Sequence, residues 1–388
     1  MIRIILLLTV CFPLIIMCSG SAPETSEPAT TWEEPVWSVP IEDLESAPSS
    51  AKTDIYLLNS PWDTRTFNNN TPVECPISAG LPTQIPDRLE NGEVDQKGWD
   101  KISNINTMLI LSDLAAEKGN KAAASCVLDH LYYWAQNNAF IVDKECEPAH
   151  KQKEMTSGHG YDRANFINGI LAIPYLQIRN APTLDESKKT AVLSWFEKLY
   201  LCSRTRAEGM LLHAQENGLG PHNQTYPALL AVATTSLILD KSDEFKWAIE
   251  QYKKSIATIS EDGTSANETA HKKGWTIHYH TVIVNFSVHL ALLGEINGFT
   301  GLFNDAPLLR LTKQVLDSYD DPTYLKKITG YEQAQDPLTT PWNLSWTEHM
   351  KRYNEDPRIT KLAKKFQWKM DHSHTGGHPE YWWQEYWE

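Results

Sequence analysis

The stretch from residue 279 to residue 298 reads YHTVIVNFSVHLALLGEING and carries a single acidic residue and no Lys or Arg. Its apolar side chains recur every three or four positions, which is the spacing along one face of an α-helix. These side chains are Val282, Phe286, Leu290 and Leu293. The glycine at the end of the stretch, Gly298, is typical of a helix C-terminus. The stretch therefore predicts an amphipathic helix that follows His278-Tyr279-His280.

Similar apolar stripes recur from about residue 99 onward, and short polar breaks separate them. The breaks fall at Glu117 to Asn120, Ile296 to Gly298 and Asp320 to Pro322. Strand patterns are sparse, helices and strands do not alternate, and no strict repeat supports a regular solenoid. We therefore predict an all-α fold, an (α/α) toroid of antiparallel helical hairpins that is incomplete as a ring.

The N-terminal region predicts export. Arg3 is followed by an apolar run from Ile4 to Met17 and then by small residues, which is the layout of a signal peptide over residues 1–22. A lipoprotein anchor at Cys18 is the alternative, although Met17 fits it poorly. Residues 23–50 are rich in Pro, Ser, Thr and Glu and predict a disordered arm. Residues 51–388 then form a single folded domain, and we expect a secreted protein with no membrane contact after signal cleavage.

Four cysteines remain beyond the predicted leader, and they permit three disulfide pairings in an oxidising compartment. They are Cys75, Cys126, Cys146 and Cys202. Five sequons of the form Asn-x-Ser/Thr indicate a glycoprotein in which some, but not all, of the sites carry glycan. They are Asn69, Asn223, Asn267, Asn285 and Asn343.

The charge balance limits the possible partners. The chain has 35 Lys and Arg against 49 Asp and Glu, a formal net charge of −14. Such a surface repels phosphate polymers, so nucleic acid is excluded as a partner. An acidic ligand would need a local basic cleft. We expect the chain to act as a monomer.

Three passages carry polar residues that indicate chemistry. The first holds His222, Asn223 and Gln224 just before Tyr226 and Pro227, at the start of an apolar helix. A helix N-terminus offers free N–H groups that favour an anion, although a simple helix cap is an equally good interpretation.

The second passage runs from the Asn267-Glu268 pair to His271 and Lys272 and then to His278-Tyr279-His280. It could present a cation and a phenol to one cleft. Zinc is a competing interpretation, but histidines two positions apart on a helix point to different faces. We therefore expect no metal and no other cofactor.

The third passage is Gly158-His159-Gly160-Tyr161-Asp162-Arg163, which enters another helix. Arg163 could bind a carboxylate, and an ion pair with Asp162 or another acid is the alternative. The aromatic and His-rich tail from His372 to Trp387 is expected to close the fold rather than to bind sugar.

Several of these stretches resemble one known family. Residues 126–135 (CVLDHLYYWA), Asn267-Glu268, Tyr279-His280 and residues 295–298 (EING) are similar to the alginate lyase family of helical-toroid polysaccharide lyases, that is, polysaccharide lyase family 5 and its relative family 38. The similarity extends, with gaps, from about residue 99 to about residue 335. It is carried by the order and spacing of the stretches together, since no single motif decides it.

The resemblance implies an enzyme that cleaves β-1,4-linked uronates by β-elimination. The family's Tyr-His pair matches Tyr279 and His280, so Tyr279 inherits the acid/base role. The family's Arg falls on Lys272, or on His271 if the gap is placed elsewhere. The family also has an Asn-Asn-His-x-Tyr-Trp segment. In this chain Asn223 stands at one of its Asn positions, Gln224 stands at the His position and Pro227 stands at the Trp position. His222 could substitute for the missing His from a shifted position.

The β-elimination of a uronate requires hydrogen-bond donors, a cation and a base, which are the residue types found in these passages. The proton at C5 of a uronate is hard to remove until donors and a cation neutralise the carboxylate beside it. Candidates for that neutralisation are His222, Asn223, Gln224 and Lys272. In mannuronate and glucuronate the proton and the C4 oxygen leave from the same side, so the Tyr279 phenol can serve as base and then as acid. We expect His271, His280, Tyr226, Arg163 and His159 to bind substrate. Nothing in these residues separates alginate from glucuronan.

Two other functions remain open at this stage. A glycosidase on a similar helical ring would need paired carboxylates across its cleft. Asp162 and Glu268 are present, but no spacing marks them as a pair. A catalytically silent carbohydrate-binding protein is favoured by the changed His and Trp positions.

Overall fold

The structure is a computed structural model that describes residues 58–76, 83, 105–141, 159–334, 339–367 and 379–382. Within these ranges it leaves out the side chains of residues 106, 159–168, 272, 342, 380 and 381. The predicted leader and arm, residues 1–22 and 23–50, lie outside the described residues. Ile55–Glu388 form one compact unit.

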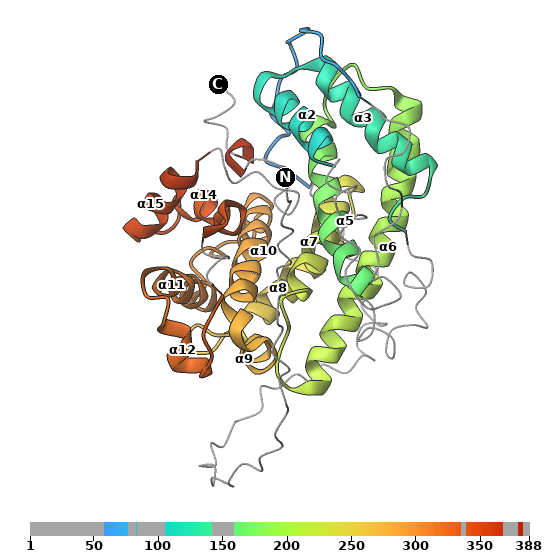
Figure 1. The fold of residues 1–388 in the computed structure, drawn as a ribbon. Helices are drawn as coiled ribbons and strands as arrows, with labels where there is room; N and C mark the ends of the chain where they lie inside the picture. The colour runs from blue at the N-terminus through green and yellow to red at the C-terminus, as the bar shows by residue number, and fades with distance from the viewer. Residues whose placement is uncertain are drawn as a thin grey trace, which may run out of the picture. The chain divides into compact units, whose positions relative to one another are not determined.

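The described residues form helices joined by turns, as predicted, and they contain no strand (Figure 1). The α-helices are α2 (Ile105–Lys118), α3 (Lys121–Gln136), α5 (His159–Ile178), α6 (Glu186–Asn217), α7 (Thr225–Ile238), α8 (Ser242–Ile256), α9 (Ala266–Lys272), α10 (Thr276–Ile296), α11 (Ala306–Asp320), α12 (Tyr324–Thr329), α14 (Trp346–Met350) and α15 (Pro357–Phe366). Short 3-10 helices are η3 (Lys273–Trp275), η4 (Pro341–Leu344) and η5 (Pro379–Trp382). Helices α2, α10 and α11 end at the predicted breaks, so the all-α class is confirmed.

Helix α7 lies at the centre of the helix packing. Every one of its residues is buried, and its sequence TYPALLAVATTSLI contains no charged residue. It packs against α5, α6, α8 and α10. Helix α5 approaches it closely, because a Cβ added at Gly169 would lie 3.4 Å from the backbone nitrogen of Ala231. A helix without a solvent-facing side must be enclosed by its neighbours, as α7 is.

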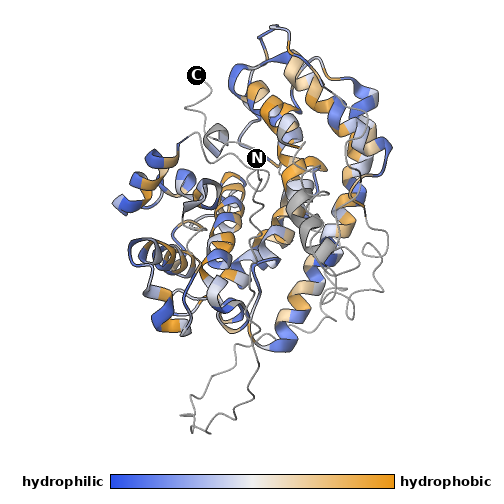
Figure 2. Cartoon of the chain, viewed as in Figure 1, coloured by the Kyte–Doolittle hydropathy of each residue, from blue (hydrophilic) through white to orange (hydrophobic). Residues whose placement is uncertain are grey.

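Helix α10 is the second inner helix and contacts α7, α8, α9, α11 and α14. It is the helix predicted to follow His278-Tyr279-His280, and it begins earlier than predicted, at Thr276, so that these three residues belong to it. Two helices farther out, α11 and α15, are apolar on one face only. Figure 2 shows hydrophilic and hydrophobic residues side by side on both. Helix α11 packs against α10 and α15 packs against α14, and each meets solvent with its other face.

The segment before α2 is tied to the ends of later helices. The backbone N–H of Asn59 donates to Oδ1 of Asn297 at 2.7 Å, and Nδ2 of Asn297 donates back to the Asn59 carbonyl at 2.9 Å. Arg179 at the end of α5 donates from Nε to Asp63 at 2.7 Å. Asn297, which the sequence placed in a turn and in a stretch that resembles the family, thus anchors the N-terminal segment to the end of α10.

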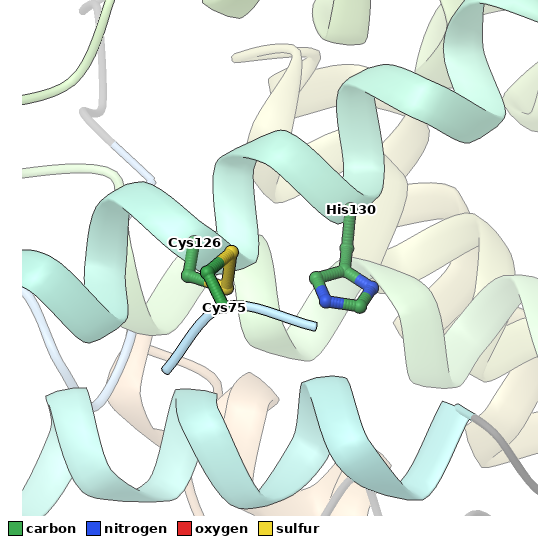
Figure 3. Close-up of side chains that lie close together, drawn as sticks. All are labelled: Cys75, Cys126 and His130. Carbon is green, nitrogen blue, oxygen red and sulfur yellow. A yellow bond between two sulfur atoms is a disulfide. The ribbon is translucent and has the colours of Figure 1, made fainter. Parts of the chain in front are cut away.

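A disulfide joins the N-terminal segment to α3. Cys75 is bonded to Cys126, with Cα atoms 5.5 Å apart and a sequence separation of 51 residues (Figure 3). Cys202 is also disulfide-bonded. Cys146 lies outside the described residues. Of the pairings that the sequence left open, the structure selects the one that contains Cys75–Cys126.

Four of the five sequons sit at buried positions. Asn223, Asn267, Asn285 and Asn343 are each less than 7 % exposed. The side chain of Asn285 accepts hydrogen bonds from the Ser345 hydroxyl and the Trp346 N–H. A glycan at any of the four would require this packing to open. Only Asn69 is partly exposed, so the folded chain offers fewer acceptor sites than the sequence count indicates.

The structure also bears on membrane contact. In the part of the chain that is described, no helix combines the length and the apolar character that a bilayer span requires.

A cluster of buried rings fixes η5 against α10 and α14. The rings of His289 and His349 lie 4.9 Å apart, and each contacts Trp382, at 4.9 and 5.4 Å. Trp382 also contacts Trp62 at 4.7 Å. The part of the aromatic tail that is described therefore closes the fold, as predicted.

Burial lowers the pKa of His289 to about 4, and it lowers the pKa of His349 well below its ordinary value.

These histidines make stability depend on pH. The pKa of His289 is 6.5 in an unfolded chain and about 4 in the folded one, so the unfolded state binds the proton first. Its contribution is complete above pH 6.5 and falls as the pH drops toward about 4, by up to about 1.4 kcal/mol per pH unit. We expect His289→Gln to flatten the dependence of the unfolding free energy on pH in this window. Urea titrations at several pH values measure this dependence. The same change of unfolding free energy with pH in the wild type and in the variant would contradict the prediction.

The Cys75–Cys126 bridge should stabilise the fold through the 51-residue separation that it closes. Loop-closure entropy of that size corresponds to about 4 kcal/mol. We expect Cys75→Ser to lower the unfolding free energy by an amount of that order, because Cys75 is exposed and its replacement leaves no cavity. Chemical unfolding measures the loss, and Thr71→Ser in the same segment serves as the control. A variant as stable as the wild type would show that the bridge constrains nothing.

Candidate active site

Tyr279 lies in the first turn of α10. Its side chain is half-buried, and its ring meets the ring of His278 edge-to-face, with centroids 5.0 Å apart. The exposed ring of Trp275, the residue just before α10, meets His278 in the same way at 6.0 Å. The beginning of α10 therefore carries three neighbouring rings, of which the central one is an imidazole.

The loop before α7 carries the second group of predicted residues, and α9 holds that loop in place. The N–H of Asn223 donates to Oε1 of Glu268 at 2.6 Å. Nδ2 of Asn267 donates to the carbonyl of Gly220 at 3.0 Å. Glu268 is fully buried, so this carboxylate acts inside the protein. The Asn267-Glu268 pair thus positions residues 220–223.

The helix that carries Glu268 is joined to α10. The N–H of Ser265, the N-cap of α9, donates to Nε2 of His280 at 3.1 Å. The hydroxyl of Thr276, the first residue of α10, donates to the carbonyl of Lys273 at 2.7 Å, and the carbonyl of Glu268 lies farther from it, at 3.4 Å. Tyr279 follows Thr276 by three positions and so lies on the same side of the helix. Asn223, Glu268 and the start of α10 form one connected unit.

His222 and Gln224 flank Asn223 at the start of α7, and both are half-buried. The N–H of Gln224 donates to Nδ1 of His222 at 3.2 Å. Because Nδ1 accepts, the neutral ring carries its proton on Nε2, which is then a hydrogen-bond donor. The side chain of Gln224 makes no capping bond to α7. Two donor side chains thus flank the anchored Asn223.

Tyr226 does not bind substrate, and this expectation is corrected. Its side chain is fully buried, and its hydroxyl donates to the carbonyl of Ser255 at 3.2 Å. Burial, assisted by the charge of Glu268, raises the pKa of Tyr226 far above its ordinary value. The phenol therefore stays protonated inside the core, where it joins α7 to α8.

His280 is a second correction. It is fully buried, its Nε2 accepts the N–H of Ser265 at 3.1 Å, and its Nδ1 lies 2.7 Å from Oε1 of Gln314. The ring is neutral because burial lowers its pKa to about 4. With both nitrogens occupied, His280 fixes the start of α9 against α10 and α11 instead of contacting a ligand.

The remaining predicted residues are placed only in part. His271 is exposed on α9, and its Nδ1 lies 3.1 Å from the Asn267 carbonyl. Lys272 ends α9, while His159 and Arg163 lie in the first turns of α5. The side chains of these last three residues lie outside the description.

Glu268 is the residue whose part in the site the sequence did not predict. It lies 45 positions from Asn223, and no spacing rule relates the two residues. The available signal was the Asn267-Glu268 pair, an acidic residue beside an Asn at the start of a short helix.

A second cluster, outside this site, contains three residue types that bind metals. Cys75, Cys126 and His130 have ligand atoms within 4.8 Å of one another (Figure 3). The two sulfurs are bonded to each other, so neither is a thiolate, which is the form that binds metal. His130 is buried, and burial lowers its pKa. In the oxidised chain these residues therefore serve as a covalent link and a packed ring.

Comparison with known proteins identifies relatives. The sequence profile of the family described as alginate lyase matches residues 44–324. An alginate lyase of Pseudomonas fluorescens is 23% identical over 235 residues, which are 59% of this chain and 58% of the relative. One of Pseudomonas aeruginosa is 25% identical over 145 residues, 37% of this chain and 39% of the relative. The chain thus spans a little over half the length of the first of these relatives.

Solved structures of alginate lyases share the fold. Alginate lyase A1-III from Sphingomonas species A1 matches with a TM-score of 0.59 and 16% identity, covering 88% of this chain and 92% of the other. A histidine-to-alanine variant of alginate lyase A1-III, complexed with a tetrasaccharide, matches with a TM-score of 0.61 and 17% identity. The match covers 80% of this chain and 87% of the other. The predicted helical toroid is thereby confirmed. That the ring is incomplete stays a prediction.

The role of Glu268 can be tested by stability. Glu268→Ala leaves the buried N–H of Asn223 without its acceptor, so we expect the unfolding free energy to fall by about 1 to 3 kcal/mol. Glu268→Gln keeps an oxygen acceptor of the same shape and should lose less. Urea unfolding measures the loss of unfolding free energy in both variants. Faster amide exchange over residues 220–224 in Glu268→Ala, but not in Glu268→Gln, would show that the loss arises in this loop. A larger loss for Gln than for Ala would contradict the positioning role.

Proposed function

Because the chain belongs to the alginate lyase family, we propose that it is a polysaccharide lyase that cleaves a β-1,4-linked polyuronate by syn β-elimination. Its substrate is polymannuronate or glucuronan. Solved complexes of histidine-to-alanine and tyrosine-to-phenylalanine variants of alginate lyase A1-III with a tetrasaccharide support an acidic sugar polymer as the ligand. The observation that carries the proposal is the connection, through α9, of residues 222–224 to the start of α10, where Tyr279 lies.

The first step is neutralisation of the uronate carboxylate. Removing the proton at C5 places charge on a carbon beside a group that is already negative, so donors must stabilise the enolate-like state. His222, Asn223 and Gln224 supply donors from the loop before α7, and Lys272 supplies the cation. The hydrogen bond from Asn223 to buried Glu268 holds this loop in advance of binding. Such preorganisation lowers the cost of reaching the transition state.

The second step is proton transfer by Tyr279. Two neighbouring phenols are unsuitable, because Tyr226 and Tyr252 are fully buried and their pKa values are raised far above the ordinary value. Tyr279 is half-buried and lies beside the polar rings of α10. As a phenolate it takes the proton at C5, the electron pair moves to form the double bond between C4 and C5, and the C4–O bond breaks. The protonated Tyr279 then returns the proton to the departing oxygen.

The changed family positions are compatible with this chemistry. Gln224 stands where the family has a His, and it offers an amide donor in place of an imidazole. His222 lies two positions earlier, with its Nδ1 facing the Gln224 backbone. Neutralisation requires donors aimed at a carboxylate rather than one particular ring, so the pair can replace the missing His.

We also propose that the chain is exported and acts outside the cell as a monomer. The signal-peptide pattern of residues 1–22 supports export. The Cys75–Cys126 bond supports an oxidising compartment.

The central test is Tyr279→Phe. We expect purified wild-type protein to generate unsaturated uronate ends, measured by their ultraviolet absorbance, on polymannuronate or glucuronan. Tyr279→Phe should lose the activity by at least about 1,000-fold and still bind polymer, because only the proton-transfer group is removed. Tyr353→Phe, a change at a partly exposed tyrosine outside the site, is the matched control and should keep full activity.

Other outcomes would select another function. Products with saturated reducing ends would indicate a glycosidase. Binding to the polymer without any product, from folded wild-type protein, would indicate a silent carbohydrate-binding protein. An active Tyr279→Phe variant would remove Tyr279 from the mechanism.

A further inference from the structure

An exposed apolar patch lies next to the proposed active site. Among the described residues, six large apolar side chains are exposed, and three of them belong to two neighbouring segments. They are Trp275 at 52%, Tyr331 at 47% and Ile328 at 40% exposure. Such clustering is typical of a surface that binds something, since single exposed apolar residues are otherwise scattered.

The turn that carries Trp275 has a strained backbone. Lys273, a residue with a side chain, has φ 44° and ψ −113°, a conformation that costs free energy in any residue other than glycine. The next residue, Gly274, has no space for a side chain, because a Cβ there would lie 2.8 Å from the carbonyl oxygen of Glu332. Strain of this kind persists only where surrounding contacts compensate for it, and it concentrates at functional sites.

Gln333 supplies much of that compensation. Its buried side chain accepts the N–H of Ile277 at 3.2 Å and donates to the carbonyl of Lys273 at 3.0 Å. The N–H of Ala334 donates to the carbonyl of Gly274 at 2.8 Å. These bonds hold the segment of Tyr331 and Gln333 against the turn of Trp275, so two exposed rings lie on adjoining segments at one corner of the protein.

A cation accompanies the aromatic rings. Nζ of Lys273 lies 5.5 Å from the centroid of the Tyr331 ring, within the range of a cation–π contact. On the other side, Trp275 is linked to Tyr279 through the ring of His278. The corner therefore combines two flat apolar rings and a positive charge, one ring away from the proposed base.

We propose that Trp275, Lys273 and Tyr331 form an outer subsite that binds a uronate residue of the polymer away from the bond being cleaved. This inference rests on the proposed function. A pyranose ring has an apolar face of C–H groups that can lie on an indole or phenol ring, while its carboxylate can pair with Lys273. A protein of net charge −14 needs such a local cation to hold an acidic polymer.

The test measures binding and turnover separately. Binding is measured by calorimetry with polymannuronate, in the Tyr279→Phe background so that the polymer is not cleaved. We expect Trp275→Ala to weaken binding about tenfold, which corresponds to the loss of one aromatic stacking contact, and Trp275→Phe to lose only part of this. Leu201→Ala, which truncates an exposed apolar residue on α6, should change nothing. Circular dichroism and thermal unfolding confirm that each variant is folded.

Turnover distinguishes an outer subsite from a catalytic role. In the otherwise wild-type enzyme, Trp275→Ala should raise KM for the polymer about tenfold and leave kcat within about twofold, because the contact is remote from the reacting bond. Unchanged affinity and KM in an enzyme that cleaves polyuronate would overturn the subsite and leave the proposed function intact. Binding that depends on Trp275 in a wild-type protein without activity would support the subsite and count against the function. A protein that neither binds nor cleaves polyuronates would overturn both.

Discussion

Helix α7 has no face that meets solvent, and this constraint organises the rest of the structure. A helix of fourteen buried residues has to be surrounded, and α5, α6, α8 and α10 surround it. The small residues of α7 and Gly169 of α5 permit close approach of the backbones. The interior is filled in this way, and the polar groups proposed for chemistry lie where the inner helices begin.

The two inner helices begin at one connected place. The loop before α7 presents His222, Asn223 and Gln224, and the first turn of α10 presents Tyr279. Helix α9 connects them, because the carboxylate of Glu268 accepts the N–H of Asn223 and the N–H of Ser265, at the start of α9, donates to His280 of α10. A buried carboxylate is costly unless it is hydrogen bonded. Its cost here is offset by its contacts, and the result is a fixed loop geometry before any ligand arrives.

The sequence predicted the parts of this arrangement that depend on local patterns. Apolar stripes at helical spacing predicted the helices and their breaks, because burial of one face imposes that spacing. The sequence did not predict that Tyr226 and His280 are inside, since a polar side chain at a helix start looks the same whether it faces a ligand or a neighbouring helix. The contacts that decide the matter come from Ser255 and Gln314, which are 29 and 34 positions away.

Pairings between distant residues were beyond the sequence for the same reason. The link between Asn223 and Glu268 and the bond between Cys75 and Cys126 join segments 45 and 51 positions apart. Their partners are set by how α3, α7 and α9 pack, and a single sequence contains no record of that packing. Composition limited the choices to four cysteines and several carboxylates, and only the folded geometry selected among them.

Charge explains why the proposed site lies where α9 meets α10. A net charge of −14 repels an acidic polymer over the whole surface, so attraction must come from a few cations close together. Lys272 and Lys273 are consecutive, and they come directly before Gly274 and Trp275. The strain at Lys273 bends the chain sharply between the last cation of α9 and the first turn of α10. Gln333 holds this bend by accepting the N–H of Ile277 and donating to the carbonyl of Lys273. Trp275 therefore lies beside His278, the ring that contacts Tyr279.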